Sequence, residues 1–395
     1  LTVLELQEVF ELMQLGNDRF LDDLQTRIGL FIQNQFTSIH PSVDWRFEDV
    51  ARIYLLRETQ PDFDGVIEEI VFQDVYPLYG QADIVGSSKL RNQYIQADLL
   101  DNLQWIHKIL EDWEVILPLH YLGAIKNRVS DNINHLMAGF NSRDETEIVE
   151  FLQEEIHPYL HQLLEQYDTL PSKNYQSYFQ QIDQELQIIY HKRKEYEQSV
   201  TRLNLAISNL LEERNLALQE VLPHYFEKYK TDGVEYNMYV GQSILQKGTF
   251  HAHHLKEFRL WQILQMCEIT RLVKTTSQEL PVPLETAQLI VTYNTPLSIR
   301  FRMDEKKFDV DGTYNVRYEI LKKRIDKSII KGSQERLTKS GTVSIVYLHE
   351  RDRIEYRQYL EFVRKEGFID GDIYDFELEK LQGAEGLRAL RFTVR

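Results

Sequence analysis

Cysteine is almost absent from this chain, which carries only Cys267 among its 395 residues. A single thiol excludes an internal disulfide framework, and it also excludes a zinc site built from several cysteines of this chain. Proteins that work outside the reducing cytosol commonly depend on such disulfides. The scarcity of cysteine therefore indicates a cytoplasmic protein.

Long apolar runs are also missing. No stretch approaches the roughly 20 apolar residues needed to span a bilayer, so no membrane span is predicted. The start of the chain lacks the basic segment and apolar segment of a secretory signal. It begins at Leu1, where the spacing of Leu4, Leu6 and Val9 already predicts a helix, so we expect the chain to continue a longer polypeptide.

Basic residues are outnumbered, with 45 Lys and Arg against 62 Asp and Glu and a formal net charge of -17. This balance argues against general binding of nucleic acids or anionic membranes. The net charge becomes positive between residues 300 and 339, where twelve basic residues outnumber seven acidic ones. Four of them form a candidate basic patch, either for an anionic ligand or an acidic surface of the same protein, or as a merely solvated face: Arg300, Arg302, Lys322 and Lys323.

Familiar catalytic motifs are absent as well. The sequence contains no Gly-x-Ser-x-Gly elbow, Walker sequence, Gly-x-Gly-x-x-Gly fingerprint or His-Glu-x-x-His motif. His251, His253 and His254 are spaced by two and one, which does not converge on one helix face, so they are interpreted as a polar cap. The sequence indicates no catalytic residue, metal ligand or cofactor, and a non-enzymatic protein is favoured.

A heptad pattern dominates what is present. Apolar residues recur at steps of three and four from Tyr175 to Val221, with no Pro or Gly between them. This period predicts one helix roughly 70 Å long. Either a second chain covers its seam, making a homodimer, or the helix belongs to an antiparallel bundle within one chain. The candidate seam residues are Ile189, Tyr196, Val200, Leu203, Ile207 and Leu210.

The chain is long enough for two or three domains, and 43% hydrophobic content is typical of a folded protein. Helical spacing before a Leu170-Pro171-Ser172 break predicts a helical bundle, and the composition shifts again at Pro281-Val282-Pro283. We predict a mainly α-helical protein with a C-terminal α+β domain. The domains are a helical bundle at 1–170, the heptad helix at 171–222, a helical, aromatic-rich hinge at 223–280 and the α+β domain at 281–395.

The α+β domain is predicted because segments with strand-like spacing are interspersed with segments with helical spacing. The expected order is β-β-α-β-α-β-β, with helices on one face of a small sheet. The predicted strands lie at 287–293, 297–302, 342–348, 374–378 and 390–394, and the predicted helices at 313–330 and 352–366.

The segment from Tyr76 to Asn92 is a candidate ligand site. Its Pro and Gly residues predict an end to the preceding element, and Ser87 or Ser88 is placed to cap a helix that runs from about Lys89 to Leu117. A helix N-terminus with basic residues one turn inside would hold a phosphate or carboxylate, although most such starts are only caps. The candidate residues are Tyr79, Gln81, Asp83, Gly86, Ser87, Ser88, Lys89, Arg91 and Asn92.

Four strings along the chain resemble a family of uncharacterised, cytosolic Bacteroidetes-type signalling proteins described as GAF-domain-containing. The strings are FTSIHPSVDWRF at 36–47, YPLYGQADIVGSSKLRN at 76–92, PHYFEKYKTDGVEYNMYVG at 223–241 and SIRFRMDEKKFDVDG at 298–312. The resemblance covers the region outside the GAF module, which is expected elsewhere in the polypeptide. It implies a regulatory role downstream of a small-molecule sensor.

Three functions follow as hypotheses. The first is a non-enzymatic regulatory, signal-transducing or scaffold protein that transmits its state through the long helix and homodimer contacts. The second is a nucleotide- or phosphate-binding module, or an enzyme of unfamiliar type. The third is a structural protein that forms larger assemblies. The expected partners are a second copy of the chain and a small anionic ligand.

Overall fold

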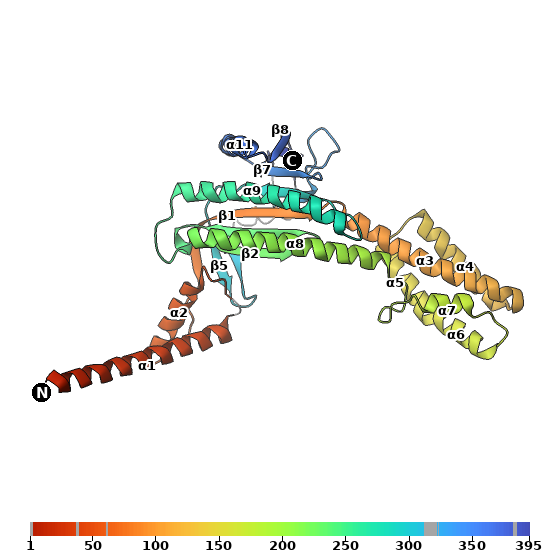
Figure 1. Cartoon of the computed structure of the whole chain (residues 1–395), viewed down its shortest axis with the longest axis horizontal. Helices are drawn as coiled ribbons and strands as arrows, with labels where there is room; N and C mark the ends of the chain where they lie inside the picture. Colours follow the sequence, from red (N-terminus) through yellow and green to blue (C-terminus); the bar gives the residue numbers. More distant parts are fainter. Residues whose placement is uncertain (1–2, 37–38, 61, 312–321, 323, 382–384) are drawn as a thin grey trace. The chain divides into compact units, whose positions relative to one another are not determined.

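The computed structural model describes residues 3–36, 39–60, 62–311, 322, 324–381 and 385–395. These residues form two compact units (Figure 1). Unit 1 consists of Leu1–Asp83, Ala206–Lys274 and Thr286–Arg395, and unit 2 consists of Ile84–Leu205 and Thr275–Glu285. Both units are therefore assembled from segments that lie far apart in the sequence.

The described residues contain a run of helices between strands β1 and β2 and a strand-rich region after α9. The helices are α1 Val3–Gln35, α2 Asp44–Arg57, α3 Ser87–Ile116, α4 His120–Ala138, α5 Ser142–Glu150, a π-helix Phe151–Ile156, α6 His157–Gln166, α7 Lys173–Phe179, α8 Lys192–Val221, α9 Ala252–Thr276 and α11 Glu350–Lys365. The strands are β1 Val71–Ile84, β2 Tyr225–Lys230, β3 Val234–Val240, β4 Thr286–Val291, β5 Leu297–Arg302, β6 Lys307–Asp311, β7 Thr342–Tyr347, β8 Ile369–Glu377 and β9 Arg388–Val394.

Unit 1 is built on a mixed sheet. Its described strands follow the order β2-β3-β1-β4-β7-β9-β8, and β5 joins β1 to β6. The pair β4–β7 is parallel, whereas β1–β3, β2–β3, β7–β9 and β8–β9 are antiparallel. The predicted mixture of α and β structure is confirmed, but the sheet draws strands from across unit 1 and not only from the C-terminal region.

Strand β1 overturns the prediction of a purely helical domain at 1–170. Gly80 was expected to help end an element, yet it lies inside β1, opposite Tyr236 of β3. A Cβ at this position would lie 2.3 Å from Met266 Cε and 2.7 Å from Tyr236 Cζ. Glycine is needed here because helix α9 and the sheet approach each other closely, and not because the chain turns.

The aromatic segment at 223–241 forms a β-hairpin and not a helical hinge. Tyr225 of β2 pairs with Tyr239 of β3, and the two strands are joined by the Thr231–Gly233 turn. Gly233 is required in that turn because an added Cβ would lie 2.1 Å from the Ala82 carbonyl oxygen. The predicted helical assignment of residues 223–241 is thus wrong.

Unit 2 is helical and has its own apolar core. Leu103, Ile106, Leu110 and Trp113 of α3 are fully buried in it. The core also takes side chains from α4, from the α5, π-helix and α6 segment, and from α7. Amphipathic spacing in these helices predicted such a bundle.

The prediction of one uninterrupted helix from Tyr175 to Val221 is wrong. Helix α7 ends at Phe179 and α8 begins at Lys192. Between them the Asp183 carboxylate accepts the backbone N–H groups of Glu185 and Leu186, which makes a local turn. Asp side chains compete in this way for backbone donors that a helix would use, and the helix is therefore broken. The heptad spacing of apolar residues continues along the sequence across this break.

The start of α8 is capped from another helix. The two carboxylate oxygens of Asp98, on α3, accept the backbone N–H groups of Lys192 and Arg193 at 3.0 and 2.9 Å. One turn along α3, Asn102 binds both the N–H and the carbonyl of Ile189. Asp98 therefore holds the first turn of α8, and Asn102 holds the chain just before it.

The seam residues of α8 are covered within the single chain. Ile189, Tyr196, Leu203 and Ile207 are buried, and Val200 and Leu210 are half-buried. Side chains that are already buried in one chain are not available to form a dimer seam. Most of these side chains are therefore covered by described residues of one chain, while the homodimer and the intramolecular bundle both stay predictions.

Most of the predicted C-terminal elements are confirmed as β4, β5, β7, α11, β8 and β9. Strand β6 was not among the predicted strands. The predicted helix at 313–330 lies largely outside the described residues, although Ile325–Lys327 forms a short 3-10 helix. None of the helices in the described ranges has the length and apolar content that a bilayer crossing requires.

We predict that Asp98→Ala lowers the free energy of unfolding by about 1–2 kcal/mol, because it leaves two N–H groups of α8 without their acceptor. Urea denaturation followed by circular dichroism measures the change. Asp101→Ala is the matched control, since Asp101 pairs with Lys192 through an exposed side chain. Equal losses from both variants would show that the cap does not carry this energy.

A second prediction concerns pH. Burial, and then the nearby His161, lower the pKa of His157 to about 4, and its Nε2 lies 2.9 Å from the Tyr178 hydroxyl. The unfolded chain binds a proton at about pH 6.5, so stability is complete above that pH and is lost as the pH falls toward 4. Between pH 7 and 5 the difference in His157 protonation costs about 2 kcal/mol.

Urea titrations of the wild type and His157→Gln at pH 7 and pH 5 test this expectation. The variant should lose less stability on acidification, whereas His120→Gln, at an exposed position, should behave like the wild type. Parallel pH dependence in wild type and His157→Gln would contradict the assignment.

Candidate functional site

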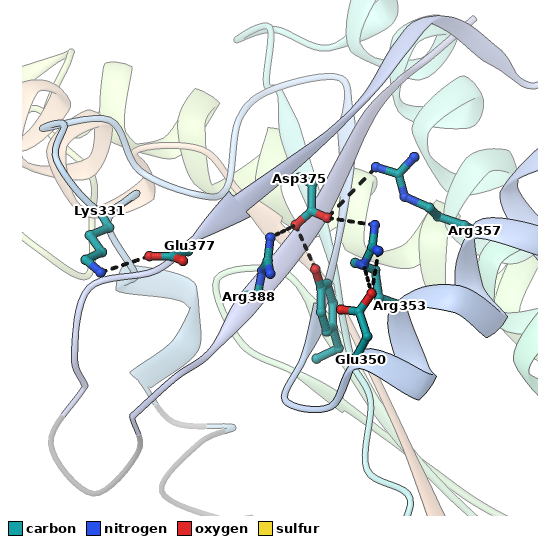
Figure 2. A network of polar contacts seen from close by, with 8 residues as sticks. Lys331, Glu350, Arg353, Arg357, Asp375, Glu377 and Arg388 are labelled. Carbon is teal, nitrogen blue, oxygen red and sulfur yellow. Dashed lines mark hydrogen bonds and ion pairs between the residues drawn. The ribbon is translucent and has the colours of Figure 1, made fainter.

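Three arginines surround one carboxylate in unit 1, and we call this group the arginine cluster. Arg353 and Arg357 lie one turn apart on α11, Arg388 is the first residue of β9, and Asp375 lies on β8. Figure 2 shows the three guanidinium groups directed toward the Asp375 carboxylate from two sides. The pairing of β8 with β9 and the packing of α11 on β8 bring them together.

The contacts of Asp375 differ in strength. Its Oδ1 accepts a hydrogen bond of 2.7 Å from the Tyr347 hydroxyl, on strand β7, which β9 separates from β8. The arginine nitrogens lie farther away, at 3.3 Å for Arg388, 3.5 Å for Arg353 and 3.9 Å for Arg357. Charge-assisted hydrogen bonds are usually about 2.7–2.9 Å long, so the guanidinium groups are near the carboxylate without being tightly bonded to it.

Two donors of the cluster are unused. The Nε atoms of Arg357 and Arg388 are buried and have no hydrogen-bond partner among the described residues. An unmet buried donor costs about 1–3 kcal/mol, and more when the group is charged. Groups of this kind are expected where an additional acceptor binds.

The cluster carries excess positive charge. Glu350 neutralises part of it, since its Oε1 accepts a 2.7 Å hydrogen bond from Arg353 Nε. This contact with Arg353 lowers the pKa of Glu350, and Glu350 in turn raises the pKa of Arg353. Three guanidinium groups against the carboxylates of Glu350 and Asp375 leave a net charge of +1.

A hollow of about 640 Å³ adjoins the cluster at Arg388. Its other charged residues are paired, as Lys331 with Glu377 at 2.8 Å (Figure 2) and Lys380 with Glu385. Glu379 adds one more carboxylate to its lining. The hollow is therefore balanced in charge, and the positive excess belongs to the side formed by α11.

This arrangement is suited to binding an anion. Guanidinium groups offer several N–H donors in a fixed plane and match the oxygens of carboxylates and phosphates. It is not suited to metal binding, and no group of three or more His, Cys, Asp or Glu in the described part of the chain is placed to hold a metal ion.

The predicted ligand segment at 76–92 is divided between the two units. Tyr79, Gln81 and Asp83 lie on β1 in unit 1, whereas Gly86 to Asn92 begin α3 in unit 2. Tyr79 is buried, and its hydroxyl donates to Glu235 at 2.8 Å. It is thus a core residue of unit 1.

The start of α3 differs from the predicted cap. The N-cap position is Gly86, in the left-handed region at φ 70°, and no side chain caps the helix. Ser87 and Ser88 are the first two helical residues, and neither is the N-cap. Lys89 and Arg91 are exposed and Asn92 is half-buried on this first part of α3.

The predicted basic patch is largely neutralised by carboxylates. Arg300 pairs with Glu69 at 2.7 Å and with Asp311 at 2.8 Å, and Arg302 pairs with Asp304 at 3.4 Å. Lys322 Nζ lies 5.2 Å from the centre of the Tyr79 ring. Lys323 lies outside the described residues. Because Arg300 and Arg302 already have acidic partners, these two strand arginines do not form an excess of positive charge.

Sequence reasoning missed the arginine cluster. One part of it was visible, because Arg353 and Arg357 are four residues apart in a predicted helix and share one face. Asp375 and Arg388 belong to different strands, and their meeting depends on the pairing of β8 with β9. Nothing in the spacing of these residues along the chain indicates that pairing.

No protein-family model matches the chain, and no curated protein matches it. Solved structures with similarity include the guanylyl cyclase Cya2, at 11% identity and a TM-score of 0.29, covering 56% of this chain and 86% of the cyclase chain. The adenylyl cyclase CyaB from P. aeruginosa is also similar, at 11% identity and a TM-score of 0.31, covering 51% of this chain and 83% of that chain. At these TM-scores the similarity supports no conclusion about activity.

Proposed function

We propose that unit 1 is a non-enzymatic binding module that recognises an anionic group at the arginine cluster. The observation that carries this proposal is the surplus of donors around Asp375. Three guanidinium groups share one carboxylate, and the buried Nε atoms of Arg357 and Arg388 have no acceptor. Because these Nε atoms are buried, a bound anion would add acceptors at the exposed parts of the same guanidinium groups.

The exposure of the arginines supports binding from solution. Their side chains are 28% exposed for Arg353, 43% for Arg357 and 40% for Arg388. A ligand can therefore reach them, while the surrounding protein shields part of each charge from water. Charge–charge attraction is stronger under such partial shielding than between fully solvated groups.

A regulatory role of anion binding at the arginine cluster is favoured over a catalytic role. Both carboxylates of the cluster are engaged by arginines, so neither is available as a general base. The resemblance of four sequence strings to GAF-domain-containing signalling proteins supports the same choice. In this proposal the occupied and empty forms of the cluster are the two states of the module.

Arg357→Gln and Arg388→Gln test the proposal. Each removes one guanidinium group and should weaken binding of inorganic phosphate about tenfold, since hydrogen bonds to charged groups contribute about 1.5–3 kcal/mol. Isothermal titration calorimetry of the full chain at low ionic strength measures the affinity. Added sodium chloride should weaken binding in the wild type.

Arg364→Gln is the matched control. Arg364 also lies on α11, but it pairs with Glu361 and donates to the Gly371 carbonyl. Its loss should leave phosphate affinity unchanged. The proposal fails if the wild type does not bind phosphate, or if all three variants weaken binding equally.

A further inference from the structure

Asp375 occupies the position in the arginine cluster where an anionic ligand would be expected. Its carboxylate is the acid that Arg353, Arg357 and Arg388 have in common. In charge and in donor geometry, a carboxylate among guanidinium groups resembles a bound anion. The protein thus supplies an anion to its own binding site.

The geometry shows an incomplete fit between this carboxylate and the arginines. Asp375 is fixed by Tyr347 through the 2.7 Å hydrogen bond to Oδ1. Its other oxygen, Oδ2, has Arg353 and Arg357 as neighbours at 3.5 and 3.9 Å, both longer than a charge-assisted hydrogen bond. One carboxylate of fixed position therefore leaves the arginines attracted but under-bonded.

The place of Asp375 in the fold also limits how tightly it can bind the arginines. It lies on β8, the terminal strand in the order of the sheet, and the pairing of β8 with β9 shifts register between Asp370 and Tyr374. The paired residue of β9 is Leu390, whose backbone fixes the position of the Asp375 backbone. The reach of its short side chain is set by this strand and not by the arginines.

We infer that Asp375 is a built-in competitor for the guanidinium groups of the anion site, and that the ligand which binds beside it is a small-molecule phosphate monoester. This inference rests on the proposed function. With Asp375 in place the cluster has a net charge of +1, and without that carboxylate it has +2. A phosphate monoester carries about -1.5 to -2 charges near pH 7 and three acceptor oxygens, so it balances the charge of the guanidinium groups better than a carboxylate does.

Asp375→Asn is the direct test, because it removes the competing charge with little change of shape. The amide oxygen of Asn can still accept the hydrogen bond from the Tyr347 hydroxyl. We expect the variant to bind inorganic phosphate about tenfold more tightly than the wild type, because a like charge next to the ligand is gone. Isothermal titration calorimetry of the full chain at a fixed pH of about 7.5 measures both affinities.

Two comparisons make the test specific. Asp372→Asn removes the same charge from an exposed position of β8, and it should leave the affinity unchanged. Sulfate and acetate are titrated beside phosphate, and the gain in Asp375→Asn should be large for the two dianions and small for acetate. Asp375→Ser is a second variant that also removes the charge, in case the amide disturbs the fold as judged by thermal unfolding.

Each outcome separates this inference from the proposed function. Tighter phosphate binding by Asp375→Asn or Asp375→Ser, with no gain in Asp372→Asn, supports the competitor role. Unchanged or weaker binding by both folded Asp375 variants overturns it, while loss of binding in Arg357→Gln still upholds the anion site. If neither the wild type nor the Asp375 variants bind phosphate, the proposed function itself is wrong. A gain that is equal for acetate and phosphate overturns the assignment to a phosphate monoester.

Discussion

The hydrogen bonds from Asp98 and Asn102 to the chain before and at the start of α8 constrain the whole of unit 2. Asn102 is fully buried and uses its amide completely, since it binds both backbone groups of Ile189, the Asp98 carbonyl and the Tyr178 hydroxyl. Burial raises the pKa of Asp98, while the backbone donors of α8 oppose that rise. These polar groups are buried at a cost that is offset only when all their partners are in place. The register between α3 and α8 is therefore specified by hydrogen bonds as well as by apolar packing.

Unit 1 differs from unit 2 in what holds its elements together. The strands of its sheet are held by regular pairing and by an aromatic core, and its buried charges are paired, as Arg259 is with Glu355 through two contacts of 2.8 and 2.9 Å. The arginine cluster departs from this rule, because it contains more donors than acceptors and its ion-pair distances to Asp375 are long. The side chains of Arg353, Arg357 and Arg388 are 28%, 43% and 40% exposed, so a ligand can reach them from solution. The contrast with the Arg259 pair is the physical reason for assigning a ligand to the cluster.

The sequence predicted well where local pattern and burial agree. Helices α3 and α11 and strands β4, β7 and β9 were found from the sequence, because each presents one repeated face to a core or is apolar throughout. It failed at β1, where Pro77 and Gly80 resemble the end of an element although they lie within a paired strand. It also failed between Phe179 and Lys192, where the heptad spacing persists but Asp183 and Asp98 take the backbone donors. The first error comes from strand pairing between distant segments, and the second from the local turn at Asp183 together with the contacts of the distant Asp98.

The sequence by itself determined the mixed helix and strand content, the near absence of cysteine chemistry, the excess of negative charge and most C-terminal elements, because these depend on composition and on spacing within short segments. Only the tertiary structure decided that the α8 seam is covered within one chain, that the strand arginines Arg300 and Arg302 are neutralised, and that Arg353, Arg357 and Arg388 meet at Asp375. Charge density and burial depend on which side chains share a small volume. That volume is created by strand pairing and helix packing, which bring together residues whose separation along the chain carries no trace of their contact.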